Sequence, residues 1–205
     1  MLPSLAFFIA ALVLAVTPGP GIAYVVARTA AGGRAEGLAS CVGTALGGML
    51  HVGAAALGLS VLLAQSAMAF SVVKYIGAAY LVYLGIRLLL SKSALAPVQA
   101  RPTGVRRALM EGIVVEALNV KTALFFLAFL PQFLFGGSSV VVQLIVMGTV
   151  CVVLNTLVDV MAVLGAARLL MSKASERQRA RWLNTTSGVT LVGLGLYVAA
   201  SKRGA

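Results

Sequence analysis

A few ionisable side chains interrupt long apolar stretches of this chain. Glu116 and Lys121 lie in the stretch 113–135, Asp159 lies in 140–170, and His51 lies in 38–65. Because a charge inside a bilayer is costly, such residues usually face the protein interior and bind substrates, ions or protons there. Lys121 could bind a carboxylate, while Glu116 or Asp159 could bind an ammonium group.

Two of these residues, His51 and Asp159, are candidates for proton coupling. Histidine titrates near neutral pH, which suits a proton carrier. Asp159 is the only acid between residues 140 and 170. Structural roles remain open as alternatives: a hydrogen-bonded His51 inside a helix bundle, an Asp159 near the membrane surface, and a Lys121 whose long side chain reaches that surface.

A second group of residues could act through the backbone groups that a helix break leaves free. Pro18, Gly19 and Pro20 lie inside the apolar stretch 5–27, where proline removes a backbone donor and glycine weakens a helix. A broken helix is tolerated in lipid only where protein buries it or where it faces a wet cavity. The amides freed at such a break could bind a carboxylate. The alternative is a plain kink that fits the bundle.

The composition indicates which elements position these residues. The chain of 205 residues is 60% hydrophobic and 10% charged, with a mean hydropathy of +1.03, whereas soluble domains are about 25% charged. Bilayer-spanning helices need about 20 apolar residues. Six stretches qualify, at 5–27, 38–65, 70–90, 113–135, 140–170 and 182–200. Continuous apolarity favours helices over barrel strands, so we predict an all-α, polytopic membrane protein with six transmembrane helices in one domain, 1–205.

The distribution of basic residues predicts the orientation. The net charge of +11 could suggest nucleic-acid binding, but the charges lie in short loops between apolar stretches. Basic loops stay cytoplasmic. The first, third and fifth loops carry twelve basic residues, which are Arg28, Arg34, Arg87, Lys92, Arg101, Arg106, Arg107, Arg168, Lys173, Arg177, Arg179 and Arg181. We therefore expect both termini to be periplasmic and nucleic acid not to be a partner.

The two halves of the chain show a weak internal repeat. The segments LVYLGIRLLLSK (81–92) and LVGLGLYVAASK (191–202) share Leu-Val-x-Leu-Gly and a closing Ser-Lys. We predict one repeat at about 1–92, a linker at 93–107 and a second repeat at about 108–205. Three spans per repeat would insert the second one upside down. Pro18–Pro20 then corresponds to Asn119–Lys121, so helices one and four are expected to be broken and to meet. The alternative is a six-helix bundle without a repeat.

Several motifs in order resemble the LysE/RhtB-type amino-acid exporters over nearly the whole chain. They are TPGPG (17–21), GGRAEGL (32–38), GTALGGMLH (43–51), KYIGAAYLVYLGI (74–86) and ALNVKTALFFLAFLPQF (117–133). The resemblance implies secondary-active export of amino acids or related metabolites from the bacterial cytoplasm across the inner membrane. One departure concerns helix four, where the family pattern Asn-Pro-Lys is Asn119-Val120-Lys121 here. Its break could instead be a kink held by Asn119, a bend at Pro131, or absent.

These observations together define the predicted site and exclude other classes. The substrate-binding candidates are Pro18, Gly19, Pro20, Glu116, Asn119, Lys121 and Asp159. Cys41 and Cys151 have no metal-ligand spacing, and a single histidine argues against a metal site, so we expect no metal, no cofactor and no enzymatic activity. Export of another small solute or a metal ion, and a non-transport membrane module, remain alternatives. The Gly43-x-x-x-Gly47 spacing favours packing within the chain and leaves a homodimer open.

Overall fold

The computed structural model describes residues 4–17, 19–61, 66–90, 101–136, 139–169 and 176–200. Every regular element among these residues is a helix, as the composition predicted. The elements are α1 (Leu5–Val16), α2 (Pro20–Ala54), the π-helix η1 (Ala55–Leu59), α4 (Ala67–Leu90), α5 (Val105–Ala117), α6 (Val120–Phe129), the 3₁₀ helix η2 (Leu130–Phe133), α7 (Val140–Leu169) and α8 (Glu176–Ala200).

Several of these helices are long and apolar enough to cross a membrane. By length and composition, Val140–Gly165 qualifies singly, and so does Pro20–Leu59, although the latter contains a break at Gly33. Val105–Ala117 with Val120–Phe133 qualify as one span bent by 45°. Leu5–Val16 and Gly188–Ala200 are shorter apolar helices. Large apolar side chains stay exposed on the outside, as at Leu57 (72%) and Met161 (71%). Such extended apolar exposure is consistent with a polytopic membrane protein.

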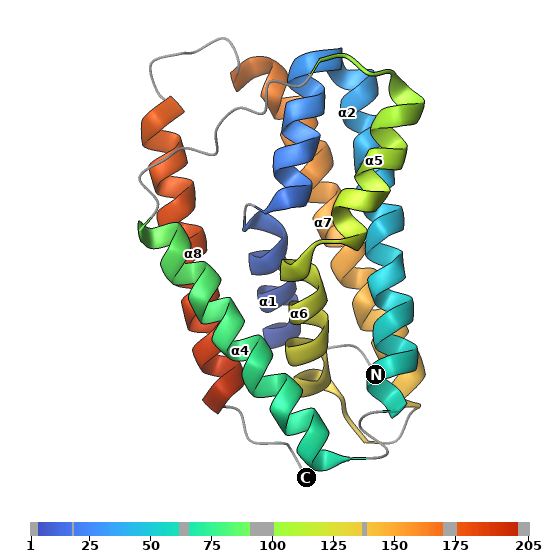
Figure 1. The fold of residues 1–205 in the computed structure, drawn as a ribbon, viewed down its shortest axis with the longest axis vertical. Helices are drawn as coiled ribbons and strands as arrows, with labels where there is room; N and C mark the ends of the chain where they lie inside the picture. Colours follow the sequence, from blue (N-terminus) through green and yellow to red (C-terminus); the bar gives the residue numbers. More distant parts are fainter. Residues whose placement is uncertain are drawn as a thin grey trace.

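The chain runs back and forth along the long axis of the molecule (Figure 1). The first limb of α2 (20–32) rises from α1 to the upper end, where Gly33 reverses the chain, and the second limb (34–54) descends. Gly33 has φ 76° and ψ −170°, a backbone conformation that favours glycine because it has no Cβ. After α4 rises, α5 and α6 descend, α7 rises and α8 descends. The start of α1 and the end of α8 therefore lie at the same lower end.

Glycines allow the two halves of the sequence to pack backbone against backbone. A Cβ on Gly43 of α2 would clash with the carbonyl oxygen of Leu109 in α5, and one on Gly47 would lie 2.6 Å from that of Ile113. Gly85 and Gly188 bring α4 and α8 equally close. Small residues permit such approach where lipid gives no hydrophobic drive for association. The predicted packing role of Gly43 and Gly47 within the chain is confirmed.

An aromatic cluster in α6 and η2 contacts α1. Phe125 and Phe129 stack with ring centroids 4.6 Å apart, and Phe129 contacts Phe133 at 4.8 Å. Phe7 of α1 meets Phe133 edge to face at 5.6 Å. Phe7, Phe125 and Phe129 are at most 1% exposed, so the cluster is part of the packed core. The break after α1 and the break before α6 are linked by Lys121, which contacts the end of α1.

Candidate functional site

The first helix is broken between α1 and α2. Its upper end is Val16, after which Thr17 has an extended backbone (φ −66°, ψ 116°) and donates its hydroxyl to the Val13 carbonyl at 2.7 Å. Gly19 is also extended, and α2 begins at Pro20. Proline suits the first helical position because its missing N–H would have no partner there. Gly19 and Pro20 therefore lie at the break, while Pro18 lies outside the described residues.

Lys121 of α6 reaches across to this break. Its ammonium group donates to the carbonyl oxygens of Thr17 at 2.8 Å and Leu14 at 3.3 Å. A Cβ on Gly19 would lie 3.0 Å from Lys121 Nζ, so a larger residue there would crowd the lysine. The cation thus caps the carbonyl end of α1, where the helix dipole favours positive charge. Stretches 18–20 and 119–121 were expected to meet, and Gly19 and Lys121 do lie next to each other.

The fourth predicted span is broken too, although it lacks the family proline. Between α5 and α6, Leu118 and Asn119 leave the helical conformation, and the two helices meet at 45°. The Asn119 side-chain oxygen accepts from the Lys121 backbone N–H at 3.1 Å, which is the N-cap role that asparagine fills well. The break is therefore held by Asn119. A continuous helix is wrong, and Pro131 lies further on, in η2.

Glu116 lies between the two breaks, and both of its carboxylate oxygens accept hydrogen bonds. Asn119 Nδ2 donates to Oε2 at 2.9 Å and Thr122 Oγ1 donates to Oε1 at 2.7 Å. Oε2 also lies against the first turn of α2, where a Cβ on Gly21 would be 2.7 Å from it. A negative charge is favourable at a helix N-terminus. Glu116 forms no ion pair with Lys121 within 4 Å, although both are buried.

His51 stabilises the carbonyl end of α5. Its Nε2 lies 2.8 Å from the backbone oxygen of Glu116. Because a carbonyl can only accept, Nε2 must carry the proton. His51 belongs to the second limb of α2, so the contact also ties α2 to α5. The structure places His51 beside the break and does not place it among the residues that line the pocket described below.

Asp159 lies deep in the bundle on α7, with only 1% of its surface exposed. Its Oδ2 accepts from Thr44 Oγ1 at 3.1 Å, and the same hydroxyl is 3.0 Å from the Cys41 carbonyl. Asp159 is not ion-paired with Lys121 within 4 Å. The side chain of Arg168, the other cation considered from the sequence, lies outside the described residues.

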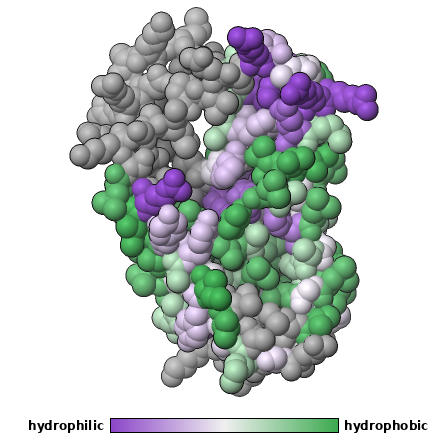
Figure 2. Space-filling model, viewed as in Figure 1, coloured by the Kyte–Doolittle hydropathy of each residue, from purple (hydrophilic) through white to green (hydrophobic). Residues whose placement is uncertain are grey.

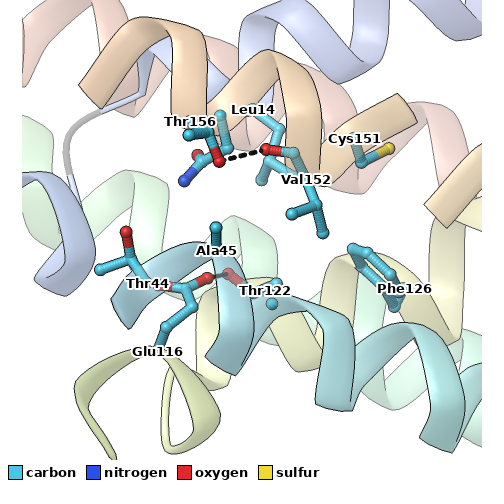
Figure 3. Close-up of a pocket in the computed structure, with 11 residues that line it drawn as sticks. Leu14, Thr44, Ala45, Glu116, Thr122, Phe126, Cys151, Val152 and Thr156 are labelled. Atoms are coloured by element: carbon cyan, nitrogen blue, oxygen red, sulfur yellow. Dashed lines mark hydrogen bonds between the residues drawn. The ribbon is translucent and has the colours of Figure 1, made fainter. Parts of the chain in front are cut away.

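A small pocket with a cavity volume of about 20 Å³ lies beside these groups (Figure 3). This is room for about one water molecule. Thr44 and Ala45 of α2 face Val152 and Thr156 of α7 across it, and Phe126 of α6 closes one end. The lining residues are Leu14, Thr44, Ala45, Gly48, Glu116, Thr122, Phe126, Cys151, Val152, Asn155 and Thr156.

Of the predicted site residues, Glu116 lines this pocket directly. Asp159 contacts it through Thr44, whereas Gly19, Asn119 and Lys121 lie behind Glu116 at the breaks. Sequence reasoning missed Thr44, Thr122 and the other small polar lining residues. A threonine in an apolar helix usually bonds its own backbone, as Thr156 does to Val152 at 2.8 Å, so its sequence gives little signal of a site.

A second polar network joins the two halves at the upper end. Arg28 Nη2 and Glu111 Oε2 form an ion pair at 2.6 Å, and Arg28 also donates to Thr103 Oγ1 at 2.8 Å. Glu36, 5% exposed, accepts from the backbone N–H groups of Thr103 and Gly104 at the start of α5. Hydrophilic residues gather over this end of the visible face, above a largely hydrophobic middle (Figure 2).

No group of three or more His, Cys, Asp or Glu side chains suited to a metal occurs among the described residues. Cys41 and Cys151 are both free and buried. Lys121 contacts the end of a helix, while Glu116 and Asp159 accept hydrogen bonds from threonine hydroxyl groups. Carboxylate and hydroxyl groups at such positions can accept hydrogen bonds from a polar group that enters the pocket.

Comparison with known proteins agrees with these features. A family description, LysE type translocator, matches residues 12–202. An uncharacterized membrane protein of Vibrio cholerae is 29% identical over 97% of each chain. A homoserine/homoserine lactone efflux protein of Salmonella typhimurium is 27% identical over 96% of each chain. A leucine efflux protein of Salmonella choleraesuis is 28% identical over 62% of this chain and 61% of its own.

No solved structure matches the chain significantly. The family match covers most of the sequence, and its relatives are membrane and efflux proteins. The family is one of translocators and not of enzymes. Together with the apolar helices, this makes the chain a multi-pass membrane protein that belongs to the LysE type translocator family.

Proposed function

We propose that the protein is a secondary-active exporter of amino acids or closely related metabolites in the bacterial inner membrane. The observation that carries this proposal is the meeting of two helix breaks, one from each half of the chain, beside a pocket lined by a buried carboxylate. Broken helices that meet near the middle of a bundle are a common way for transporters to present backbone and charge to a substrate. Relatives named as amino-acid efflux proteins support the substrate class.

The proposed architecture has six spans in two inverted halves. α1 with the first limb of α2, the second limb of α2, and α4 would form one half, and α5 with α6, α7 and α8 the other. The course of the chain in Figure 1 supports this, because the described spans alternate in direction. The turn at Gly33 and the start of α5, both of which have basic residues in or beside them, lie at the end opposite to the start of α1. Basic loops are cytoplasmic, which would leave both termini in the periplasm.

The proposed substrate is zwitterionic, and its ammonium group would approach Glu116 and the Thr44–Asp159 pair. Its carboxylate would be bound by backbone amides freed at the start of α2, at Gly19–Pro20 and the predicted Pro18, with Lys121 nearby. Asn119 would keep Glu116 and Lys121 in place. In this arrangement Lys121 and Glu116 act both on the substrate and on the helix ends. Movement of one half against the other would then expose the pocket to alternate sides.

In the described conformation the cytoplasmic end would be the closed one. Arg28 with Glu111, and Glu36 with Thr103 and Gly104, link the two halves there. These contacts would have to break for substrate to enter from the cytoplasm. Because the sequence has no G-x-x-x-x-G-K-[ST] motif for ATP, the energy would come from an ion gradient or the membrane potential. Asp159 and His51 are the proposed proton-coupling residues.

Transport by purified protein in vesicles tests the proposal. Vesicles loaded with single labelled amino acids would be given either a pH gradient or a membrane potential, and efflux would be measured. We expect the wild type to export at least one amino acid. Asp159→Asn keeps an acceptor for Thr44 but loses the charge, so it should reduce gradient-driven efflux. Lys121→Ala should abolish efflux, and Lys74→Ala, a matched lysine that is equally buried at 8%, should preserve it.

Two results would overturn the proposal. If the wild type moves no amino acid under either driving force, export of amino acids is wrong. If Asp159→Asn and Lys121→Ala both transport like wild type, the site assignment is wrong even though transport stands. Gel filtration in detergent shows whether each variant is folded, so a lost activity is not confused with a lost protein.

A further inference from the structure

Exposed arginines gather at the upper end, where the turn between the two limbs of α2 meets the start of α5. Glu36, just after this turn, accepts from the backbone N–H of Gly104 at 2.7 Å, so the two segments are in direct contact. Arg34 lies two residues from Glu36, and Arg106 lies two residues from Gly104. Two residues of chain span at most about 7 Å, so the long side chains of both arginines can reach a common ligand.

These arginines have no acidic partner. The side chains of Arg34, Arg101 and Arg106 are exposed and form no ion pair or hydrogen bond with the residues that the structure describes. The neighbouring acids do not balance them, because Glu36 is buried against the start of α5 and Glu111 is paired with two other arginines. Positive charge left uncompensated at a membrane surface attracts anionic groups.

A row of exposed apolar side chains continues from each arginine toward the middle of the molecule. Intervals of four residues keep the members of a row on one face of their helix. The rows are Leu38, Val42 and Leu46 after Arg34 on α2, and Met110 and Val114 after Arg106 on α5. Their members are between 42% and 56% exposed, so both rows are open to the surroundings of the protein.

The two rows lie on the same outer side of the α2–α5 pair. Both helices descend from the upper end (Figure 1), and a Cβ on Gly112 would lie only 3.2 Å from Gly43 Cα. At 3.6 residues per turn, Leu46 and Met110 are each about a quarter of a turn from this contact, on the side away from α7. On the opposite side of α2, Thr44 bonds to Asp159 of α7. The rows therefore flank the line of contact between the helices.

The geometry points to a binding site for an anionic phospholipid on this outer face. The phosphate would bind Arg34 and Arg106, because a guanidinium group matches phosphate with two parallel hydrogen bonds. The acyl chains would lie along the two apolar rows, which a soluble anion would leave empty. The bound lipid would link the two halves of the sequence where the Arg28–Glu111 ion pair also links them. This site goes beyond the proposed export function and does not depend on it.

Thermal unfolding of the full chain in detergent tests the site, with native mass spectrometry to count retained lipids. A ligand that binds only the folded protein raises its unfolding temperature. We expect dioleoylphosphatidylglycerol to be retained and to raise this temperature, and dioleoylphosphatidylcholine, which has the same chains and no net charge, to do neither. Glycerol phosphate at the same concentration has the anionic group without the chains and should not stabilise the protein.

Substitutions locate the site. Arg34→Gln and Arg106→Gln should each weaken the apparent affinity for phosphatidylglycerol about fivefold, and the double variant should lose more than either. Arg34→Lys keeps the charge without the planar fork and should bind with intermediate affinity. Arg87→Gln is the matched control, because Arg87 is an exposed arginine in the last turn of α4, and it should bind like wild type. Without lipid, all variants should unfold like wild type, since these side chains have no internal partner to lose.

Each contrary result overturns a defined part of the inference. If phosphatidylcholine stabilises the protein as much as phosphatidylglycerol does, the site does not recognise an anionic head group. If glycerol phosphate is as effective, the ligand is a soluble phosphate and not a lipid. If Arg87→Gln loses as much affinity as Arg34→Gln, only general surface charge matters. If the double variant binds like wild type, the lipid binds elsewhere. Export in vesicles is measured separately, so its failure would leave this inference unaffected.

Discussion

The two helix breaks look alike in outline but are made in different ways. Between α1 and α2 the chain leaves the helix at Thr17 and starts again at Pro20, with Gly19 as an N-cap that offers no side-chain hydrogen bond. Between α5 and α6 it starts again at Val120, and the Asn119 side chain supplies the N-cap. At the first break, Pro20 lacks a backbone N–H and Gly19 weakens a helix. At the second break, the Asn119 side chain accepts the hydrogen bond of a backbone N–H group.

The difference matters because the second break supplies polar partners to the first, whereas the first supplies few to the second. Residues around the second break supply the charges at the first: Lys121 caps the end of α1, and Glu116 lies at the start of α2. Among the described residues of the first break, none contributes a side-chain hydrogen bond to the second. The carbonyl end of the second break is bound by His51 instead. Substitutions that remove polar side chains at the second break should therefore destabilise both breaks. A proline at the start of α6, like the proline at the start of α2, should be tolerated.

The largest effect is expected for Lys121→Met. The substitution keeps the length of the side chain but leaves the carbonyls of Leu14 and Thr17 without their donor. Hydrogen bonds to charged groups are worth about 1.5–3 kcal/mol each, so we expect a loss of about 3 kcal/mol in unfolding free energy, measured by denaturation in detergent. Lys121→Arg keeps a charged donor for these carbonyls and should lose less. Equal losses in the two variants would show that donation to these carbonyls does not stabilise the break.

Asn119→Ala should have the next largest effect. It removes the N-cap of α6 and leaves Glu116 Oε2 without its donor. Loss of an N-cap costs about 0.5–2 kcal/mol. Asn119→Asp keeps the cap acceptor but cannot donate to Glu116, so it separates the two contributions. If alanine and aspartate variants both unfold like wild type, the second break does not depend on this side chain.

A smaller loss is expected for His51→Leu. The substitution removes the donor to the Glu116 carbonyl while keeping an apolar side chain beside Phe126. Interhelical hydrogen bonds in membrane proteins average about 0.6 kcal/mol, and we expect a loss of that order. His51→Gln retains an N–H donor and should recover part of it. A transport defect in His51→Gln without a stability defect would instead favour proton coupling through the ring.

The smallest effect is expected for Val120→Pro, which restores the proline of the family pattern. Val120 is the first residue of α6, and the preceding Asn119 already has φ −74° and ψ 98°, the extended conformation that proline requires before it. We expect the unfolding free energy to change by no more than about 0.5 kcal/mol. Ala123→Pro, three residues on, removes the N–H that bonds to Asn119 and should cost about 3 kcal/mol. A large loss in Val120→Pro would contradict the described break.

For the charged residues of the site, the sequence predicted burial but not the hydrogen-bond partners. Lys121, Glu116 and Asp159 were predictable as interior residues because a charge in a long apolar stretch must find polar partners. Their partners were not predictable in the same way. Lys121 bonds carbonyls more than a hundred positions earlier, and Asp159 bonds Thr44. Sequence patterns within one helix cannot specify such contacts, because they depend on which faces of distant helices come together.

The sequence by itself determined that the chain is helical and apolar, and that the first predicted span breaks at proline and glycine. These properties follow from local physics: long stretches of mostly apolar residues, the missing N–H of proline, and the conformational freedom of glycine. The tertiary structure alone decided that Asn119 breaks α5 from α6 without a proline, and that a pocket lined by Thr44 and Asn155 opens beside Glu116. A side-chain cap and a cavity exist only once distant segments pack, since each is stabilised by contacts that no single segment contains.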